Sequence, residues 1–192
     1  MKRLFQTLSL VVLLSLPALP CSAADTYFGV NAGAWTPHDT STIDSNLKPI
    51  TSEYSTGWSL GGTYGTSFAN GFRVENELVY RQAEAKRCSS DAWNLAFLFN
   101  AWWDGRNSTP VAPYFGGGFG FASGRNASPG IVDNRGSGIA YQAGGGFILS
   151  PRSSGYDIDL GYRYFGINDT SNRTGAMDVT GSSWLLGIKK IF

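Results

Sequence analysis

Several residue types that mark enzymes, metal proteins and disulfide-stabilised domains are scarce in this chain. Its 192 residues include two cysteines, Cys21 and Cys88, and one histidine, His38. If Cys21 leaves with an export signal, the remaining lone cysteine can close no internal disulfide. The sequence also has no zinc-ligand spacing, phosphate loop or nucleotide-binding fingerprint. We therefore expect no cofactor, no metal and no catalytic residues.

An excess of charge of one sign is lacking as well. The chain has 15 basic and 14 acidic residues, for a formal net charge of +1. Such a balance argues against nucleic acid as a partner.

Long apolar runs are absent after the N-terminus. Lys2 and Arg3 precede an apolar run over 8–19, and small residues follow at 22–24. This order is typical of a secretory signal, so we expect residues 1–24 to be cleaved and 25–192 to form one domain. Removal of the signal lowers the basic count from 15 to 13, against 14 acidic residues. No later run is long enough to span a bilayer as a helix, so entry into a membrane requires strands.

The chain does contain a repeated alternation of apolar with small, polar or charged side chains. In the segment 72–81, Phe72 and Leu78 share one parity, whereas Arg73 and Glu77 share the other. Alternate side chains of a strand point to opposite faces, so this segment has one apolar and one charged face. Eight such segments are predicted as strands: 27–36, 54–66, 72–81, 93–103, 111–123, 138–149, 156–165 and 182–192.

The connectors between these segments alternate in length. Long or fairly long polar connectors cover 37–53, 82–91, 124–137 and 166–178, whereas short ones cover 67–71, 104–110 and 150–155. Short periplasmic turns and longer extracellular loops, with an even strand number, are typical of outer-membrane barrels. The sequence thus predicts an all-β fold, an eight-stranded antiparallel up-and-down transmembrane β-barrel.

A soluble two-sheet sandwich is the alternative fold. It would place the charged parity in water, whereas a barrel in lipid would place it inside, where charges must pair. Four residues of each sign take the inward parity and are predicted to form a charge network in the lumen: Arg73, Glu75, Glu77, Arg81, Asp157, Asp159, Arg163 and Lys189. This balance favours the barrel. Trp and Tyr near the strand ends, Tyr54 among them, are further expected at the membrane interfaces.

Four segments, at 111–122, 141–146, 157–164 and 184–192, carry a resemblance to a known family. The mature chain resembles the bacterial outer-membrane β-barrel domain family that includes opacity-like, OmpX-like and other porin-family proteins. The resemblance implies an eight-stranded barrel in the outer membrane, surrounded by lipid and lipopolysaccharide. It also implies a C-terminal signal for the barrel-assembly machinery, which here falls on Trp184, Leu186, Ile188 and Phe192. Lys190 departs from the family pattern, which usually has an aromatic or apolar residue there.

The function expected on these grounds is structural or adhesive. An eight-stranded barrel is only wide enough for its own side chains, so an open pore is disfavoured. We therefore expect the extracellular loops to bind any partner. The loops would meet lipopolysaccharide, a host surface or an envelope protein, and Arg125, Arg135 and Arg173 are the candidates for phosphate contacts. The alternatives are a small diffusion pore and a lipid A-modifying enzyme. Against the enzyme, His38 lies on a loop beside Asp39 and Ser41, and sequence neighbours rarely form a catalytic triad.

Overall fold

The structure is a computed structural model that describes residues 24–38, 40–43, 49–52, 54–86, 91–105, 109–126, 134–151, 155–169 and 179–192. Apart from Ala24, the predicted signal segment lies outside the described residues, as do Asp39, Cys88 and Arg173. Within the described part of the chain, no helix has the length and apolar character needed to cross a membrane.

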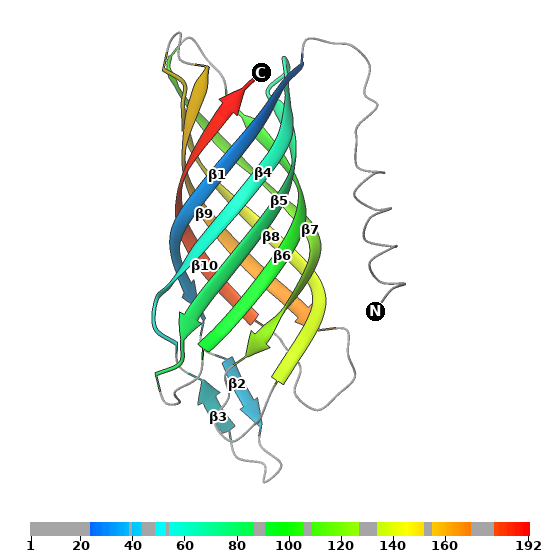
Figure 1. Cartoon of the computed structure of the whole chain (residues 1–192), viewed down its shortest axis with the longest axis vertical. Helices are drawn as coiled ribbons and strands as arrows, with labels where there is room; N and C mark the ends of the chain where they lie inside the picture. Colours follow the sequence, from blue (N-terminus) through cyan, green and yellow to red (C-terminus); the bar gives the residue numbers. More distant parts are fainter. Residues whose placement is uncertain are drawn as a thin grey trace.

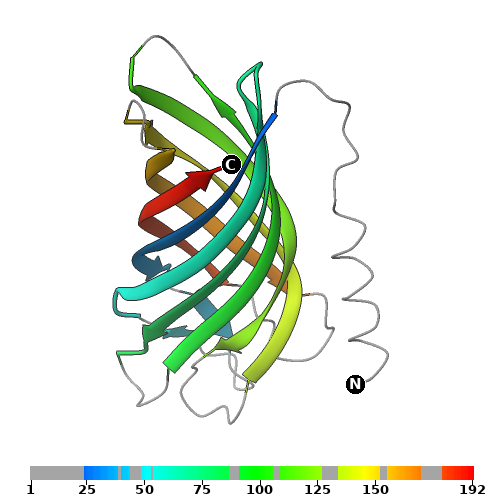
Figure 2. The same ribbon diagram turned by 45° about the horizontal axis from the view of Figure 1, so that its top comes forward.

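Eight strands close into an antiparallel barrel in the order β1-β10-β9-β8-β7-β6-β5-β4 (Figure 1). They are β1 (Ala24–Pro37), β4 (Gly57–Phe68), β5 (Phe72–Glu84), β6 (Asp91–Asp104), β7 (Val111–Asn126), β8 (Asn134–Leu149), β9 (Tyr156–Asp169) and β10 (Val179–Ile191). The first and last strands pair along eleven residue positions, from Tyr27 with Ile191 to Pro37 with Gly181. Figure 2 shows the strands winding around one axis at a steep tilt. The predicted fold is confirmed.

The start of β1, the end of β10 and the tight turn between β4 and β5 lie at one end of the barrel. Short turns are typical of the periplasmic end of outer-membrane barrels, so this end is periplasmic. At the opposite, extracellular end lies a two-stranded sheet made of β2 (Thr40–Ile43) and β3 (Pro49–Ser52) (Figure 1). The sequence predicted only a long connector at this place.

Several strands extend further at the extracellular end than predicted. β5 continues to Glu84, β7 to Asn126 and β9 to Asp169, so much of what was predicted as loop is sheet. Conversely, β4 begins at Gly57 instead of residue 54. Tyr54 forms an isolated bridge with Ala85 and is 8% exposed, so the prediction of Tyr54 as an interface aromatic was wrong.

Side chains alternate strictly between the two faces of the barrel wall. On β4, Trp58 and Leu60 are exposed on the outside, whereas Ser59 between them is buried. The outer face is apolar around the barrel, with large exposed residues such as Phe119 and Trp184, both 69% exposed. Such a surface is stable in acyl chains, where a sheet must also close because an open edge would leave backbone groups without partners.

The turn between β4 and β5 depends on a glycine. Gly71 has a φ of 86°, a backbone conformation that L side chains rarely adopt. Its N–H donates to the carbonyl oxygen of Phe68 at 3.0 Å, and its own carbonyl oxygen accepts from the Asp104 N–H at 2.8 Å. The turn thus holds the end of β6 against the start of β5.

Candidate functional sites in the barrel interior and at the rim

The periplasmic half of the lumen contains an ionic cluster around Arg73. The Arg73 guanidinium lies 3.2 Å from the Asp104 carboxylate and 2.9 Å from Oε2 of Glu75. Glu75 also accepts hydrogen bonds from the Tyr27 hydroxyl at 2.6 Å and from the Trp102 indole N–H at 2.7 Å. The cluster joins β1, β5 and β6, and all five side chains are buried. The buried charges therefore have the partners that a low-dielectric interior demands.

A second cluster centres on Asp159 of β9. Lys189 Nζ of β10 lies 2.7 Å from Oδ2 of Asp159, and the Tyr114 hydroxyl donates to Oδ1 at 2.7 Å. Arg163 donates to the Tyr114 oxygen at 2.8 Å, and its guanidinium carbon lies 4.1 Å from the centre of the Trp102 ring. Tyr114 and Asp159 are on strands that are not neighbours, so this cluster reaches through the lumen.

Neutral amides connect the strands in the middle of the lumen. Gln142 of β8 donates to Glu77 of β5 at 2.6 Å and to the side-chain oxygen Oδ1 of Asn100 at 2.8 Å. Asn100 in turn donates to Glu77 at 3.0 Å. These three residues connect β5, β6 and β8 through the lumen.

The extracellular half of the lumen is mainly apolar. Arg81 is the cation here: its guanidinium carbon lies 3.8 Å from the Phe165 ring centre and 5.3 Å from that of Trp35, and its NH1 donates to Asn94 at 3.4 Å. The buried apolar cluster consists of Trp35, Val79, Ala83, Ala96, Leu98, Ala122, Ala140, Phe165 and Ile167. Side chains thus fill this half of the lumen.

The structure places all eight side chains of the predicted lumen network inside the barrel, each 2–6% exposed. Arg73 with Glu75 and Lys189 with Asp159 form ion pairs. Asp157 is the register partner of Lys189.

Sequence reasoning missed Asp104, which it assigned to a turn. This residue adds a fifth carboxylate to the lumen. The parity of strand 93–103, extended by one position, would have found it. The uncharged partners Tyr27, Asn100, Trp102, Tyr114 and Gln142 have inward parity but no other sequence signal.

The C-terminal residues lie on the outer face of β10. Trp184, Leu186, Ile188 and Phe192 are 69%, 57%, 47% and 72% exposed. Lys190 shares this face, and its Nζ lies 5.9 Å from the Tyr156 ring centre and 5.3 Å from that of Phe192. At the periplasmic end of the barrel, a lysine can direct its ammonium group towards water while its stem lies on apolar surface.

At the extracellular end, two of the three predicted loop arginines are brought together. Arg125 of β7 and Arg135 of β8 are direct register partners. Arg125 follows the parity of Phe119 and Phe121, which is the outer face. Arg173 lies outside the described residues.

His38 also has a neighbour that its sequence position did not reveal. Its Nε2 lies 3.2 Å from Oγ of Ser182 on β10, and the Tyr162 hydroxyl donates to the same oxygen at 2.8 Å. His38 and Tyr162 are exposed, and Ser182 between them is half-buried. Within the described part of the chain, no carboxylate hydrogen-bonds to His38. The described residues also hold no cluster of three or more His, Cys, Asp or Glu side chains that suits a metal ion.

A closed antiparallel barrel with an apolar outer face and paired charges inside defines a transmembrane β-barrel protein. The chain belongs to the outer membrane protein beta-barrel domain family, whose sequence profile matches residues 7–192. It is therefore an integral protein of the outer membrane. A comparison with curated protein sequences finds no match.

Solved structures with the same fold are outer-membrane barrels. Neisserial surface protein A superposes with a TM-score of 0.62 at 18% identity, over 89% of this chain and 100% of its own. OprG of Pseudomonas aeruginosa superposes with a TM-score of 0.59 at 17% identity, over 89% of this chain and 97% of its own. A third structure is Ail, the attachment invasion locus protein of Yersinia pestis, in complex with the heparin analogue sucrose octasulfate. It superposes with a TM-score of 0.50 at 18% identity, over 90% of this chain and 100% of its own. At these identities the likeness shows the fold alone.

Proposed function

We propose that this protein is a non-enzymatic surface-interaction barrel, in which the barrel is a rigid anchor and the extracellular rim binds. The observation that supports the proposal is the filled lumen. Ionic clusters occupy the periplasmic half and an apolar cluster occupies the extracellular half. An interior built in this way leaves the rim and loops as the surface that a partner outside the cell can reach.

The paired arginines at the rim favour one class of ligand. Arg125 and Arg135 are register partners near the extracellular ends of β7 and β8. A guanidinium group binds phosphate oxygens in bidentate geometry, so two arginines at neighbouring positions favour clustered anionic groups on carbohydrate. The phosphates of lipopolysaccharide, which surrounds an outer-membrane barrel, have this chemistry. That Ail has been solved with a sulfated sugar agrees with this ligand chemistry.

The test compares unfolding temperatures in bicelles with and without lipopolysaccharide. A ligand that binds only the native state raises this temperature. We expect a rise for the unmodified protein and loss of more than half of it in Arg125→Gln/Arg135→Gln. Lys190→Gln, which removes an outward cation at the periplasmic end, is the matched control and should retain the rise.

A second arm adds sucrose octasulfate to protein in bicelles that lack lipopolysaccharide. Stabilisation here as well as by lipopolysaccharide would point to anionic sugars in general, and stabilisation by lipopolysaccharide alone would point to the membrane glycolipid. An equal response of the double variant and the unmodified protein in both arms would refute the arginine site.

Two proposals concern biogenesis. Residues 1–24 would be removed on export, and N-terminal sequencing of protein from outer membranes should then begin at Ala24 or Asp25.

The signal read by the barrel-assembly machinery would consist of Trp184, Leu186, Ile188 and Phe192. Their outward position along the last strand supports this proposal. We expect Phe192→Ala to slow assembly by the reconstituted machinery without slowing spontaneous folding into short-chain lipid.

A further inference from the structure

One side of the lumen has little side-chain volume in the middle of the barrel. The inward residues there, on β1 and β10, are Asn31, Gly33, Ser183, Leu185 and Gly187. Two of the five are glycines, so this part of the wall carries only three side chains.

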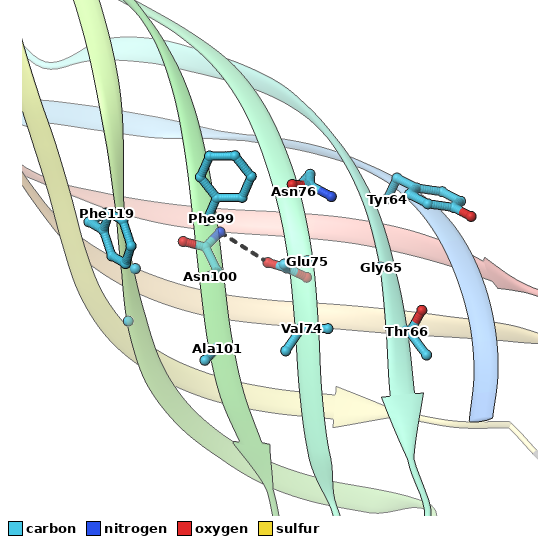
Figure 3. Close-up of a pocket in the computed structure, with 12 residues that line it drawn as sticks. Tyr64, Gly65, Thr66, Val74, Glu75, Asn76, Phe99, Asn100, Ala101 and Phe119 are labelled. Atoms are coloured by element: carbon cyan, nitrogen blue, oxygen red, sulfur yellow. Dashed lines mark hydrogen bonds between the residues drawn. The ribbon is translucent and has the colours of Figure 1, made fainter. Parts of the chain in front are cut away.

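The polar side chains of the opposite wall do not fill this side. β6 lies across the ring from β10, and Asn100 of β6 donates to Glu77 at 3.0 Å and to Glu75 at 3.4 Å (Figure 3). Both carboxylates belong to β5, the neighbour of β6. These bonds therefore hold the Asn100 amide on its own side of the lumen.

Asn31 and Leu185 point into the lumen but are not fully buried. A Cβ on Gly61 would lie 2.8 Å from Oδ1 of Asn31, and a Cβ on Gly161 would lie 3.1 Å from Cδ1 of Leu185. Both side chains are nevertheless only half-buried, whereas the residues of the ionic and apolar clusters are at most 6% exposed. The exposed surface of Asn31 and Leu185 therefore borders a space inside the barrel.

Three buried polar atoms beside this space have no hydrogen-bond partner in the described part of the chain. They are Oγ of Ser183, Nε of Arg163 and Oε1 of Gln142, and each of these residues is 3% exposed. Ser183 and Arg163 are register partners on β10 and β9, and Gln142 lies on the next strand, β8. Buried polar groups are almost always hydrogen-bonded, either to protein or to ordered water. The three atoms therefore indicate a bound partner.

The hydrogen-bonding character of the three groups identifies that partner. The guanidinium N–H of Arg163 only donates, the amide oxygen of Gln142 only accepts, and the Ser183 hydroxyl does both. An anion could not satisfy the amide oxygen, and a cation could not satisfy the guanidinium. Water both donates and accepts, and a buried water molecule typically makes about three hydrogen bonds to such groups.

We propose that the middle of the lumen binds water in a chamber bounded by Asn31, Ser183 and Leu185. The water hydrogen-bonds to Ser183, Arg163 and Gln142. The apolar cluster lies on the extracellular side of this chamber and the ionic clusters lie on its periplasmic side, so the bound water forms no continuous pore. The chamber does not depend on the ligand proposed for the rim.

Solid-state NMR of the protein in lipid bilayers tests the chamber through polarisation transfer from water protons to nearby side chains. We expect transfer to the Leu185 methyl groups. In the same mixing time we expect none to the methyl groups of Leu98, which belongs to the apolar cluster and is 0% exposed. An absence of transfer to Leu185, or equal transfer to the two leucines, would overturn the chamber.

A substitution that fills the chamber should expel the water. We expect Leu185→Phe to reduce transfer to the Asn31 side chain several-fold. Leu186→Phe is the matched control, because Leu186 lies on the outer face of the same strand and is 57% exposed; it should leave the transfer unchanged. Heat-modifiable gel migration verifies that both variants are folded. The transfer to Leu185 in the unmodified protein tests the chamber independently of these variants.

Replacement of chloride by sulfate in the buffer distinguishes water from a small anion. We expect the Nε resonance of Arg163 to be the same in both buffers. A shift of this resonance would identify a bound halide and would overturn the assignment to water.

Discussion

Gln142 on β8 donates a hydrogen bond of 2.6 Å to Glu77 on β5, although β6 and β7 separate these strands in the barrel wall. The bond therefore crosses the lumen. Together with Asn100 it fixes the distance between β5 and β8. A cross-section held in this way resists both collapse and widening, which suits an anchor for loops.

Removal of Arg73 should strongly destabilise the barrel. In Arg73→Met, Asp104 and Glu75 stay buried but lose the guanidinium that bridges them. Breaking a buried ion pair from one side costs about 3–5 kcal/mol. Urea titration in lipid vesicles, followed by tryptophan fluorescence, gives the free energy of unfolding. Arg125→Gln, a rim control, should change it by less than about 0.5 kcal/mol; a similarly small change for Arg73→Met would show that the cluster adds little.

Glycines of the inner and outer faces should differ sharply in their tolerance of alanine. A Cβ on Gly120 of β7 would overlap the carbonyl oxygen of Phe97, whereas a Cβ on Gly62 of β4 meets nothing closer than the Gly29 carbonyl oxygen at 3.9 Å. We expect Gly120→Ala to destabilise the barrel through overpacking, by about 1–3 kcal/mol. Gly62→Ala should be neutral or stabilising, because glycine within a strand is entropically unfavourable. The same urea titration compares them, and equal effects would contradict the packing argument.

The filled lumen predicts the absence of conductance. An ion crossing from end to end would have to pass the apolar cluster that contains Leu98 and Phe165, without water to replace its hydration shell. Protein reconstituted in planar bilayers should therefore show no stepwise current. Incorporation is verified by extracting the protein and recording its heat-modifiable migration. Reproducible unitary steps would support the small-pore alternative.

The His38–Ser182 pair should have no enzymatic role in lipid A modification. The Ser182 hydroxyl already accepts a hydrogen bond from Tyr162, and the described residues supply no carboxylate to orient the imidazole. Lipid A from cells expressing the unmodified protein, His38→Ala or Ser182→Ala should have identical mass spectra. Loss of an acyl chain that depends on both residues would establish an acyl hydrolase instead.

The alternation of apolar and polar side chains in the sequence was sufficient to predict most of the fold. Side chains of a strand change face at each residue whatever lies opposite, so parity alone separated Trp58 outside from Ser59 inside. Parity says nothing of depth or of which distant strands meet. The contact of Gln142 with Glu77 therefore had no sequence signal.

A local signal misled at Asp104 for a physical reason. Asp104 precedes Gly105, a pair typical of turns, yet its backbone N–H continues the hydrogen bonding into the β4–β5 turn and its carboxylate faces Arg73.

The position of Lys189 on the last strand determines the order of events when the barrel assembles. Its ammonium group reaches Asp159 only when β10 has docked between β9 and β1. Until that moment Oδ2 of Asp159 has to keep its hydration water, so a nascent sheet that lacks β10 retains water near its centre. This part of the lumen therefore loses its water at the same moment as β10 pairs with β1 and closes the barrel. A chain cut short before residue 189 would remain a hydrated, loosely packed intermediate that proteases can cleave.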